Sequence, residues 1–201
     1  MKKIMSSILV LVMLFVTLAI NASAVTIHKV EKGDSLWKIA VRYQVGLSEI
    51  KAANPSIKNY DLIYPGQTIY VSTISSLVTS FEAEVVSLVN EIRVKHGLNT
   101  LIHDWQLSRV ARYKSQDMND LNYFSHTSPT YGSPFNMMKS FGIAYRTAGE
   151  NIARGYSTPK TVVDAWMNSP GHKANILNSS YTHIGVGYVS GGHYWTQLFK
   201  G

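Results

Sequence analysis

Near the start of the chain, the pattern of apolar and polar side chains predicts two strands that enclose two short helices. Apolar and polar residues alternate over 26–30 and again over 68–71, which is typical of strands with one buried face. Asp34 or Ser35 is suited to cap a first helix, which Gly46 ends. The apolar residues of this helix recur at helical spacing and form one face: Leu36, Ile39, Ala40 and Tyr43. A second short helix follows, so the predicted order is strand, helix, helix, strand.

From Phe81 onward, the apolar positions follow a helical period. A first stripe ends at Gly97 and comprises Phe81, Val85, Leu88, Val89 and Ile92. Asp104 is suited to cap a second helix. Two further helices are predicted over 134–141 and 159–168, because a Ser-Pro and a Thr-Pro pair each place a proline at the first helical position.

The last part of the chain predicts strands. Residues 184–189 and 193–199 are rich in β-branched and aromatic side chains, and the Ser-Gly-Gly turn between them predicts a hairpin. Segment 149–153 has no clear period and is expected to connect two elements. Helices followed by a terminal hairpin predict an α+β fold. The uncharged, hydroxyl-rich residues 73–80 are predicted to link this fold to the first module.

The first residues predict an export signal rather than part of a fold. Two lysines precede an apolar run over 8–20, and an Ala-Ser-Ala sequence that ends at residue 24 offers the small-x-small pattern that signal peptidases cut. An uncleaved membrane anchor is the alternative, but the run has 13 residues, whereas a bilayer span takes roughly 20. We therefore expect residues 1–24 to be a signal peptide and no stable transmembrane span to remain after its cleavage.

Composition and charge narrow the class of protein. The chain has 201 residues and no cysteine, so its export would be of the disulfide-free kind that we associate with Gram-positive envelopes. Its formal net charge is +7, of which the two lysines of the predicted signal peptide supply +2. The remaining positive charge would attract the mature chain to an anionic wall polymer. The basic residues are scattered along the sequence rather than clustered, so nucleic acid is not an expected partner.

Three motifs together resemble a LysM module: residues 30–40 (VEKGDSLWKIA), 53–55 (ANP) and 62–71 (LIYPGQTIYV). The resemblance implies a small βααβ module over residues 25–72 that binds peptidoglycan or another N-acetylglucosamine polymer. It also implies a groove between the loop after the first strand and the loop before the second, lined by Gly33, Asp34, Ser35, Leu36, Asn59, Tyr60, Leu62 and Ile63. The alternative is that these loops only close a mini-domain, with Leu36 and Ile63 mainly in its core.

The second part of the chain resembles a bacterial domain of the CAP superfamily, which includes cysteine-rich secretory proteins, insect venom antigens and plant pathogenesis-related proteins. The resemblance rests on residues 124–126 (FSH), 149–153 (GENIA), 165–172 (AWMNSPGH), 175–177 (NIL), 183–187 (HIGVG) and 194–197 (YWTQ). It implies an α-β-α sandwich over residues 81–201.

CAP domains often place two histidines and two glutamates around one cleft, where the imidazoles can hold a divalent metal. By this resemblance the candidate cleft residues are His126, Glu150 and His183, with His126 and His183 as candidate metal ligands. The fourth position of the family, a glutamate, falls at Ser169, and His172 can partly compensate as a fourth candidate. Imidazole and carboxylate ligands suit zinc, which can lower the pKa of a bound water toward about 7.

A structural role is the alternative for each of these residues. Glu150 can accept backbone N–H groups, His126 can simply donate to it, and His172 can cap the turn that follows. The remaining histidines are expected to be surface or sheet residues: His28, His96, His103 and His193. Nucleophilic catalysis is poorly supported, because the chain has no cysteine and no Gly-x-Ser-x-Gly motif.

Two functions remain open at this point. The first is a noncatalytic protein of the cell wall or spore envelope, held to peptidoglycan by the LysM module, whose CAP cleft binds a ligand or an envelope protein. The second is a metal-dependent hydrolase that acts on envelope peptide or glycan, with Glu150 as general base. Lipid or sterol binding, which some CAP proteins show, is a third possibility without a direct marker in the sequence.

Overall fold

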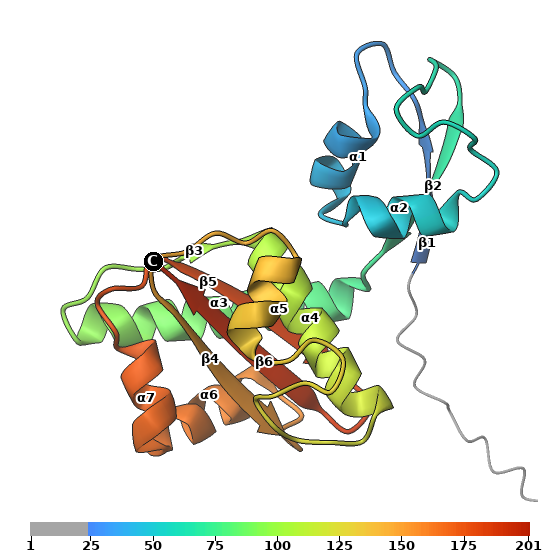
Figure 1. The fold of residues 1–201 in the computed structure, drawn as a ribbon. Coiled ribbons are helices and arrows are strands. Elements are labelled where there is room, and N and C mark those ends of the chain that lie inside the picture. Colours follow the sequence, from blue (N-terminus) through green and yellow to red (C-terminus); the bar gives the residue numbers. More distant parts are fainter. Residues whose placement is uncertain (1–23) are drawn as a thin grey trace, which may run out of the picture.

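The computed structural model describes residues 24–201, which form an N-terminal and a C-terminal module (Figure 1). The predicted signal peptide, except for its last residue, lies outside the described residues. Among the helices that the structure describes, none is long and apolar enough to cross a membrane.

The N-terminal module has the predicted order of elements: β1 (Ala24–Lys29), α1 (Leu36–Tyr43), α2 (Leu47–Ala53) and β2 (Thr68–Thr73). The two strands pair antiparallel, with Ile27 opposite Tyr70. Ser35 caps α1, because its side chain accepts the N–H of Lys38. Helix α1 ends at Tyr43 and is followed by Gln44 in the left-handed conformation, so Gly46 does not end it and instead precedes α2 as its N-cap.

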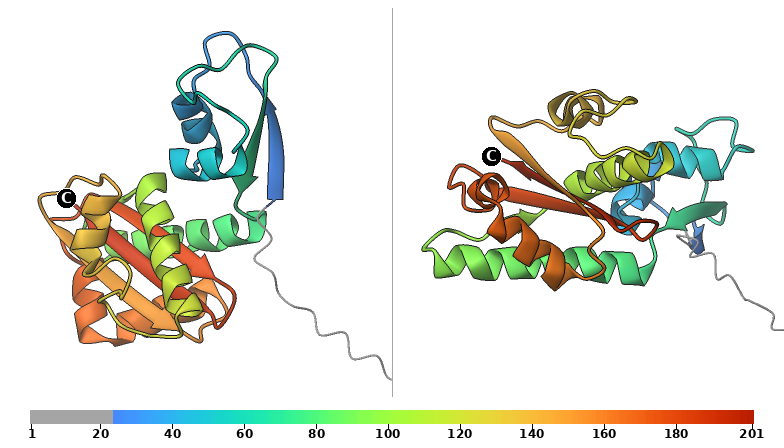
Figure 2. Two further views of the ribbon diagram at one scale, coloured as in Figure 1. Left: turned by 45° about the vertical axis from the view of Figure 1, so that its right-hand side comes forward. Right: turned by 90° about the horizontal axis from the view of Figure 1, so that it is seen from below.

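The C-terminal module is built on one four-stranded sheet of order β3-β5-β6-β4. Its elements are α3 (Ser76–Lys95), β3 (Ile102–His103), α4 (Trp105–Asp120), α5 (Pro134–Ser140), β4 (Ala148–Arg154), α6 (Pro159–Asn168), α7 (Pro170–Ile176), β5 (His183–Val189) and β6 (Tyr194–Lys200). Helices α4 and α5 cover one face of the sheet, and α3, α6 and α7 cover the other (Figure 2). These three layers confirm the expected α-β-α sandwich and the α+β class.

Strand β3 and helix α7 were not predicted, and two further segments of this module differ from the sequence prediction. Segment 149–153, expected to connect two elements, lies in strand β4, whose buried residues do not alternate because helices cover both faces of the sheet. Helix α3 begins at Ser76, inside the predicted linker, because the Ser75 side chain accepts the N–H of Val78 and caps it.

Helix α4 lies unusually close to the central strand β5. A side chain at Gly185 would collide with the backbone of α4 at Leu107 and Ser108, and one at Gly187 would collide with it at Ala111 and Arg112. The hydroxyl of Ser115 donates to the carbonyl of Gly187 and lies 2.9 Å from the hydroxyl of Thr196.

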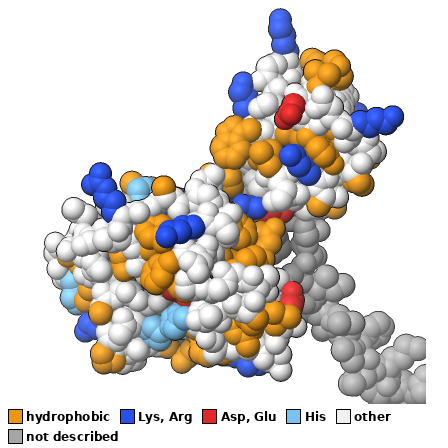
Figure 3. Space-filling model, viewed as in Figure 1, with side chains coloured by type: hydrophobic (Ala, Val, Ile, Leu, Met, Phe, Trp, Pro, Cys, Tyr) orange, Lys and Arg blue, Asp and Glu red, His pale blue; other side chains and the backbone are white. Residues whose placement is uncertain are grey.

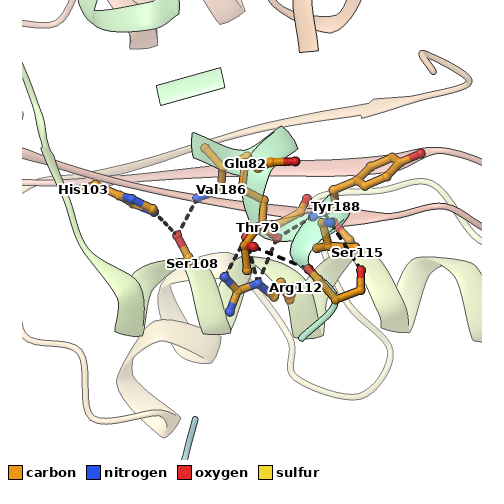
Figure 4. Close-up of polar contacts among 12 residues, drawn as sticks. Thr79, Glu82, His103, Ser108, Arg112, Ser115, Val186 and Tyr188 are labelled. Carbon is orange, nitrogen blue, oxygen red and sulfur yellow. Dashed lines mark hydrogen bonds and ion pairs between the residues drawn. The ribbon is translucent and has the colours of Figure 1, made fainter. Parts of the chain in front are cut away.

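A buried ion pair joins α3 to α4 beside the sheet (Figure 4). Arg112 donates to both carboxylate oxygens of Glu82, which is fully buried. The same carboxylate accepts the N–H of Tyr188 in β5. On the neighbouring turn of α4, Ser108 accepts the N–H of Val186. Side chains of α3 and α4 therefore each accept a backbone N–H of strand β5.

The two modules meet at Arg109 of α4. Its guanidinium binds the Glu49 carboxylate of α2 with N···O distances of 2.6 and 2.8 Å and also donates to the hydroxyl of Ser48. It lies over the rings of Tyr113 and Phe141. A side chain at Gly46 would overlap this guanidinium, so the contact needs a glycine there.

We expect Gly187→Ala to destabilise the C-terminal module by about 2 kcal/mol or more, because the new methyl group forces α4 away from the sheet. Urea unfolding followed by the fluorescence of the buried Trp166 and Trp195 measures this change. Gly171→Ala is the matched control, since its Cβ meets nothing within 4 Å and alanine is favoured over glycine in a helix by about 0.5 to 1 kcal/mol. Equal stability of the two variants would contradict the close packing of α4.

Candidate functional site

The centre of the candidate site is a glutamate–histidine pair. Strand β4 places Glu150 on the face that α4 covers, where its side chain is 2% exposed. His126, in the loop that follows α4, approaches with Nδ1 2.7 Å from Oε1 of Glu150, and its side chain is 55% exposed. An ionised carboxylate only accepts, so Nδ1 carries the proton in this bond. The buried carboxylate thus fixes the ring, while the far side of the imidazole is open to a ligand.

A buried lysine lies next to this pair. Lys114 of α4 is fully buried, and its Nζ donates to the carbonyl of Ser125 at 2.7 Å and to the hydroxyl of Tyr123 at 3.0 Å. The first bond holds the residue just before His126 in place. Burial lowers the pKa of Lys114, which the negative charges of Glu150 and Asp117 oppose.

The hydrogen bond from His126 to Glu150 raises the pKa of His126, against the opposing effects of burial and of the Lys114 charge. Burial lowers the pKa of His172, and the charge of nearby His126 lowers it further. The pKa values of the two imidazoles are therefore shifted in opposite directions from the ordinary value of histidine. On the face that Figure 3 shows, Lys and Arg side chains are spread over both modules and do not gather in one patch.

Backbone contacts bring α7 and His172 to strand β4. The side-chain amide of Asn151 donates to the carbonyl of His172, and that of Asn175 donates to the carbonyl of Glu150. Of the predicted residues, His126 and Glu150 are thus bonded to each other, whereas His172 lies on the α7 side of β4, near enough for the charge of His126 to act on it. The second oxygen of Glu150, Oε2, is buried and has no hydrogen-bond partner among the described residues.

The structure does not bring His183 to this group. His183 pairs with Lys200, which pairs with Ala148, so it lies two strands away from β4, about 10 Å at ordinary strand spacing. Its Nδ1 lies 2.7 Å from the hydroxyl of Thr182 instead. Within residues 24–201, no three His, Asp or Glu side chains come together in a group that could hold a metal ion. The donor set therefore does not fit the metal that the family resemblance implies.

The candidate glycan-binding loops of the N-terminal module lie side by side. Val30 donates to the carbonyl of Gln67 and accepts the N–H of Gly66, so both loops leave the strand pair at the same end. Gly33, Ser35, Asn59 and Leu62 are exposed on them. Leu36, by contrast, is buried in the core, and Ile63 and Tyr60 pack against it. Leu36 and Ile63 therefore have the mainly structural role that the sequence left open as the alternative to glycan binding.

Three residues near these sites were not predicted. Lys114 interrupts the apolar face of α4, and a lysine at such a position indicates a buried charge. His28 lies in β1, which agrees with the expectation of a surface or sheet residue, but it is only 5% exposed, so it is not on the surface. Trp37 is 51% exposed on α1, as its place outside the predicted apolar face of the helix indicates.

Comparison with known proteins identifies both modules. A model of the cysteine-rich secretory protein family (CAP) matches residues 86–199, and a model of the LysM domain matches residues 28–72. The chain is similar to the uncharacterized protein YkwD of Bacillus subtilis, with 64% identity over 126 residues that cover 63% of this chain and 49% of that protein.

Two further similarities concern the separate modules. The crystal structure of an extracellular protein containing a SCP domain from Bacillus anthracis matches with a TM-score of 0.60 and 35% identity, over 68% of this chain and 47% of that chain. The spore coat assembly protein ExsA of Bacillus cereus is 51% identical over 45 residues, which are 22% of this chain and 7% of that protein. The chain spans about half the length of the relatives that match its C-terminal module.

We expect Glu150→Gln to lower the pKa of His126, because the variant loses the carboxylate while burial and Lys114 still oppose the charged ring. The pKa of His172 should rise, since a less protonated His126 repels it less. Titration of the two imidazoles by NMR measures both changes. The control is Glu91→Gln, at an exposed position of α3. A His126 titration that Glu150→Gln leaves unchanged would contradict the pairing.

Proposed function

Because the chain belongs to the cysteine-rich secretory protein (CAP) family and also carries a LysM domain, we propose that it is an exported protein of the cell wall or spore envelope. In this proposal the LysM module binds peptidoglycan, and the site around His126 and Glu150 binds a ligand or an envelope protein. The name of the similar Bacillus cereus protein, a spore coat assembly protein, supports the spore envelope as one setting.

The placement of the two LysM loops carries the proposal. They lie at the end of the N-terminal module that points away from the C-terminal module, to which α2 is joined through Glu49 and Arg109 (Figure 1). A long glycan can reach the loops there without meeting the CAP module. Exposed polar groups and the apolar side chain of Leu62, which is 51% exposed, supply the mixed surface that an acetamido sugar needs.

The CAP site suits an anionic or hydroxyl-bearing ligand. At a pH between the lowered pKa of His172 and the raised pKa of His126, one imidazole is a cation and the other a neutral group that can also accept a hydrogen bond. Binding at both modules would raise the local concentration of this site at the wall even when each contact is weak.

A hydrolase is the second candidate function, and the orientation of His126 by a buried carboxylate favours it. Such a pair can move a proton at the exposed ring nitrogen, as a general base requires. Among the described residues, the pair has no adjacent serine or cysteine bonded to the ring, so the binding function is preferred.

We expect Leu62→Ser to weaken the binding of the two-module protein to purified peptidoglycan by about tenfold, since burying a leucine side chain contributes about 1.5 to 3 kcal/mol. Sedimentation of the protein with peptidoglycan at a series of concentrations measures this. Val94→Ser is the matched control, because Val94 is similarly exposed, at 59%, but lies on α3 of the other module. Equal loss in both variants, or in neither, would argue against the loops as the binding surface.

We expect the wild-type protein to release no product from cell-wall fragments or casein, because no side-chain hydroxyl among the described residues is bonded to the His126 ring. The assay compares wild type with Glu150→Gln, with and without added zinc. If the wild type releases product and Glu150→Gln does not, the CAP site is a hydrolase site and the proposed binding function is wrong.

A further inference from the structure

A buried histidine lies directly beneath the loop that joins β1 to α1. His28 of β1 is 5% exposed, and its ring stands edge-on to Tyr43 at a centroid distance of 5.7 Å. Its Nε2 lies 2.9 Å from Oδ2 of Asp34, and its Nδ1 lies 3.2 Å from the hydroxyl of Tyr43. Both ring nitrogens of this histidine therefore have partners within the module.

The partners assign the tautomer of this ring. The Asp34 carboxylate only accepts, so Nε2 carries the hydrogen, and Nδ1 accepts the hydroxyl of Tyr43. The bond from the Glu31 N–H lowers the pKa of Asp34, and the His28 bond lowers it further, which keeps the carboxylate ionised. In this tautomer, His28 gives one hydrogen bond to Asp34 and receives one from Tyr43.

Asp34 carries this constraint into the loop. Its Oδ2 also accepts the N–H of Glu31 at 2.9 Å, and its Oδ1 lies 3.5 Å from the guanidinium of Arg42. The carboxylate thereby ties the first residue of the loop to the strand below and to the helix that follows. Gly33, at the tip, has a φ of +91°, and its carbonyl accepts Nζ of Lys38 at 2.6 Å.

The exposed part of this loop is what a glycan would meet. Backbone groups at Gly33 and Ser35 can bind an acetamido group only if the loop holds one conformation, because ordering a loop on binding costs free energy. The atoms that fix this conformation are buried, and the sugar would not touch them. A residue beneath the loop therefore sets its affinity without contacting the ligand.

We infer that His28 is a positioning residue for glycan binding: through its bond to Asp34, it holds the loop of residues 31–35 in the conformation that receives an N-acetylglucosamine unit. This inference rests on the proposed peptidoglycan binding by the LysM module. It assigns Asp34, which the sequence places in the groove, to the support of the loop.

Two substitutions at one position test the inference in the two-module protein. His28→Leu removes the donor to Asp34 at similar volume, whereas His28→Gln keeps an N–H donor near the position of Nε2. The probe is a soluble N-acetylglucosamine oligomer, with affinity measured by calorimetry and the loop followed through the amide NMR signals of Gly33 and Ser35. We expect His28→Leu to weaken binding by about tenfold, a change of about 1.4 kcal/mol, and to shift both amide signals.

His28→Gln should bind within about threefold of wild type, which corresponds to less than about 1 kcal/mol. If wild type binds the oligomer and His28→Leu binds it equally with unshifted amides, the inference is wrong while the proposed function stands. If wild type binds neither the oligomer nor peptidoglycan, both fail. Should His28→Leu not fold, His28→Gln decides: folded protein that binds as wild type supports the inference, and folded protein with at least tenfold weaker binding overturns it.

Discussion

The contact between α4 and the central strand β5 fixes most of what lies around it. Gly185 and Gly187 let the helix backbone approach the sheet to a distance that no side chain would allow. Three basic side chains of α4 are positioned by this close contact. The helix directs Arg109 toward the N-terminal module, Arg112 toward the buried Glu82, and Lys114 toward the loop that holds His126. A shift of this helix would therefore disturb the inter-module contact and the candidate site together.

The electrostatics of the candidate site follow from this arrangement. Two imidazoles lie close to one another, but only His126 is bonded to a carboxylate, so the pKa of His126 rises and that of His172 falls. The difference requires Glu150 to remain buried, because in water its influence on His126 would be screened. Strand β4 provides that burial, since helices cover both of its faces. The same coverage removes the alternation of polar and apolar residues by which a strand is recognised in sequence.

Local signals in the sequence were sufficient for several elements that one residue begins. Asp104, Ser133 and Thr158 each cap the helix that their type and position predict, and the terminal hairpin forms as its turn residues indicate. Which residues meet at the site depends on how distant segments are arranged in space, and the order of the motifs along the chain does not predict this arrangement. His183 begins a strand as expected, but the strand order β5-β6-β4 separates it from Glu150, whereas a short helix that the sequence did not predict places His172 beside β4.

Polar contacts have a different role in the N-terminal module, where the core is small. A domain of this size buries too little apolar surface to define every loop by packing. Asn54, 3% exposed, donates to the carbonyls of Ile50 and Tyr70 and accepts the N–H of Tyr70, which joins α2 to β2. The pair of His28 and Asp34 does the same for β1 and the loop before α1. Since each bond has a direction as well as an energy, a few of them specify a binding surface that hydrophobic contacts alone would leave variable.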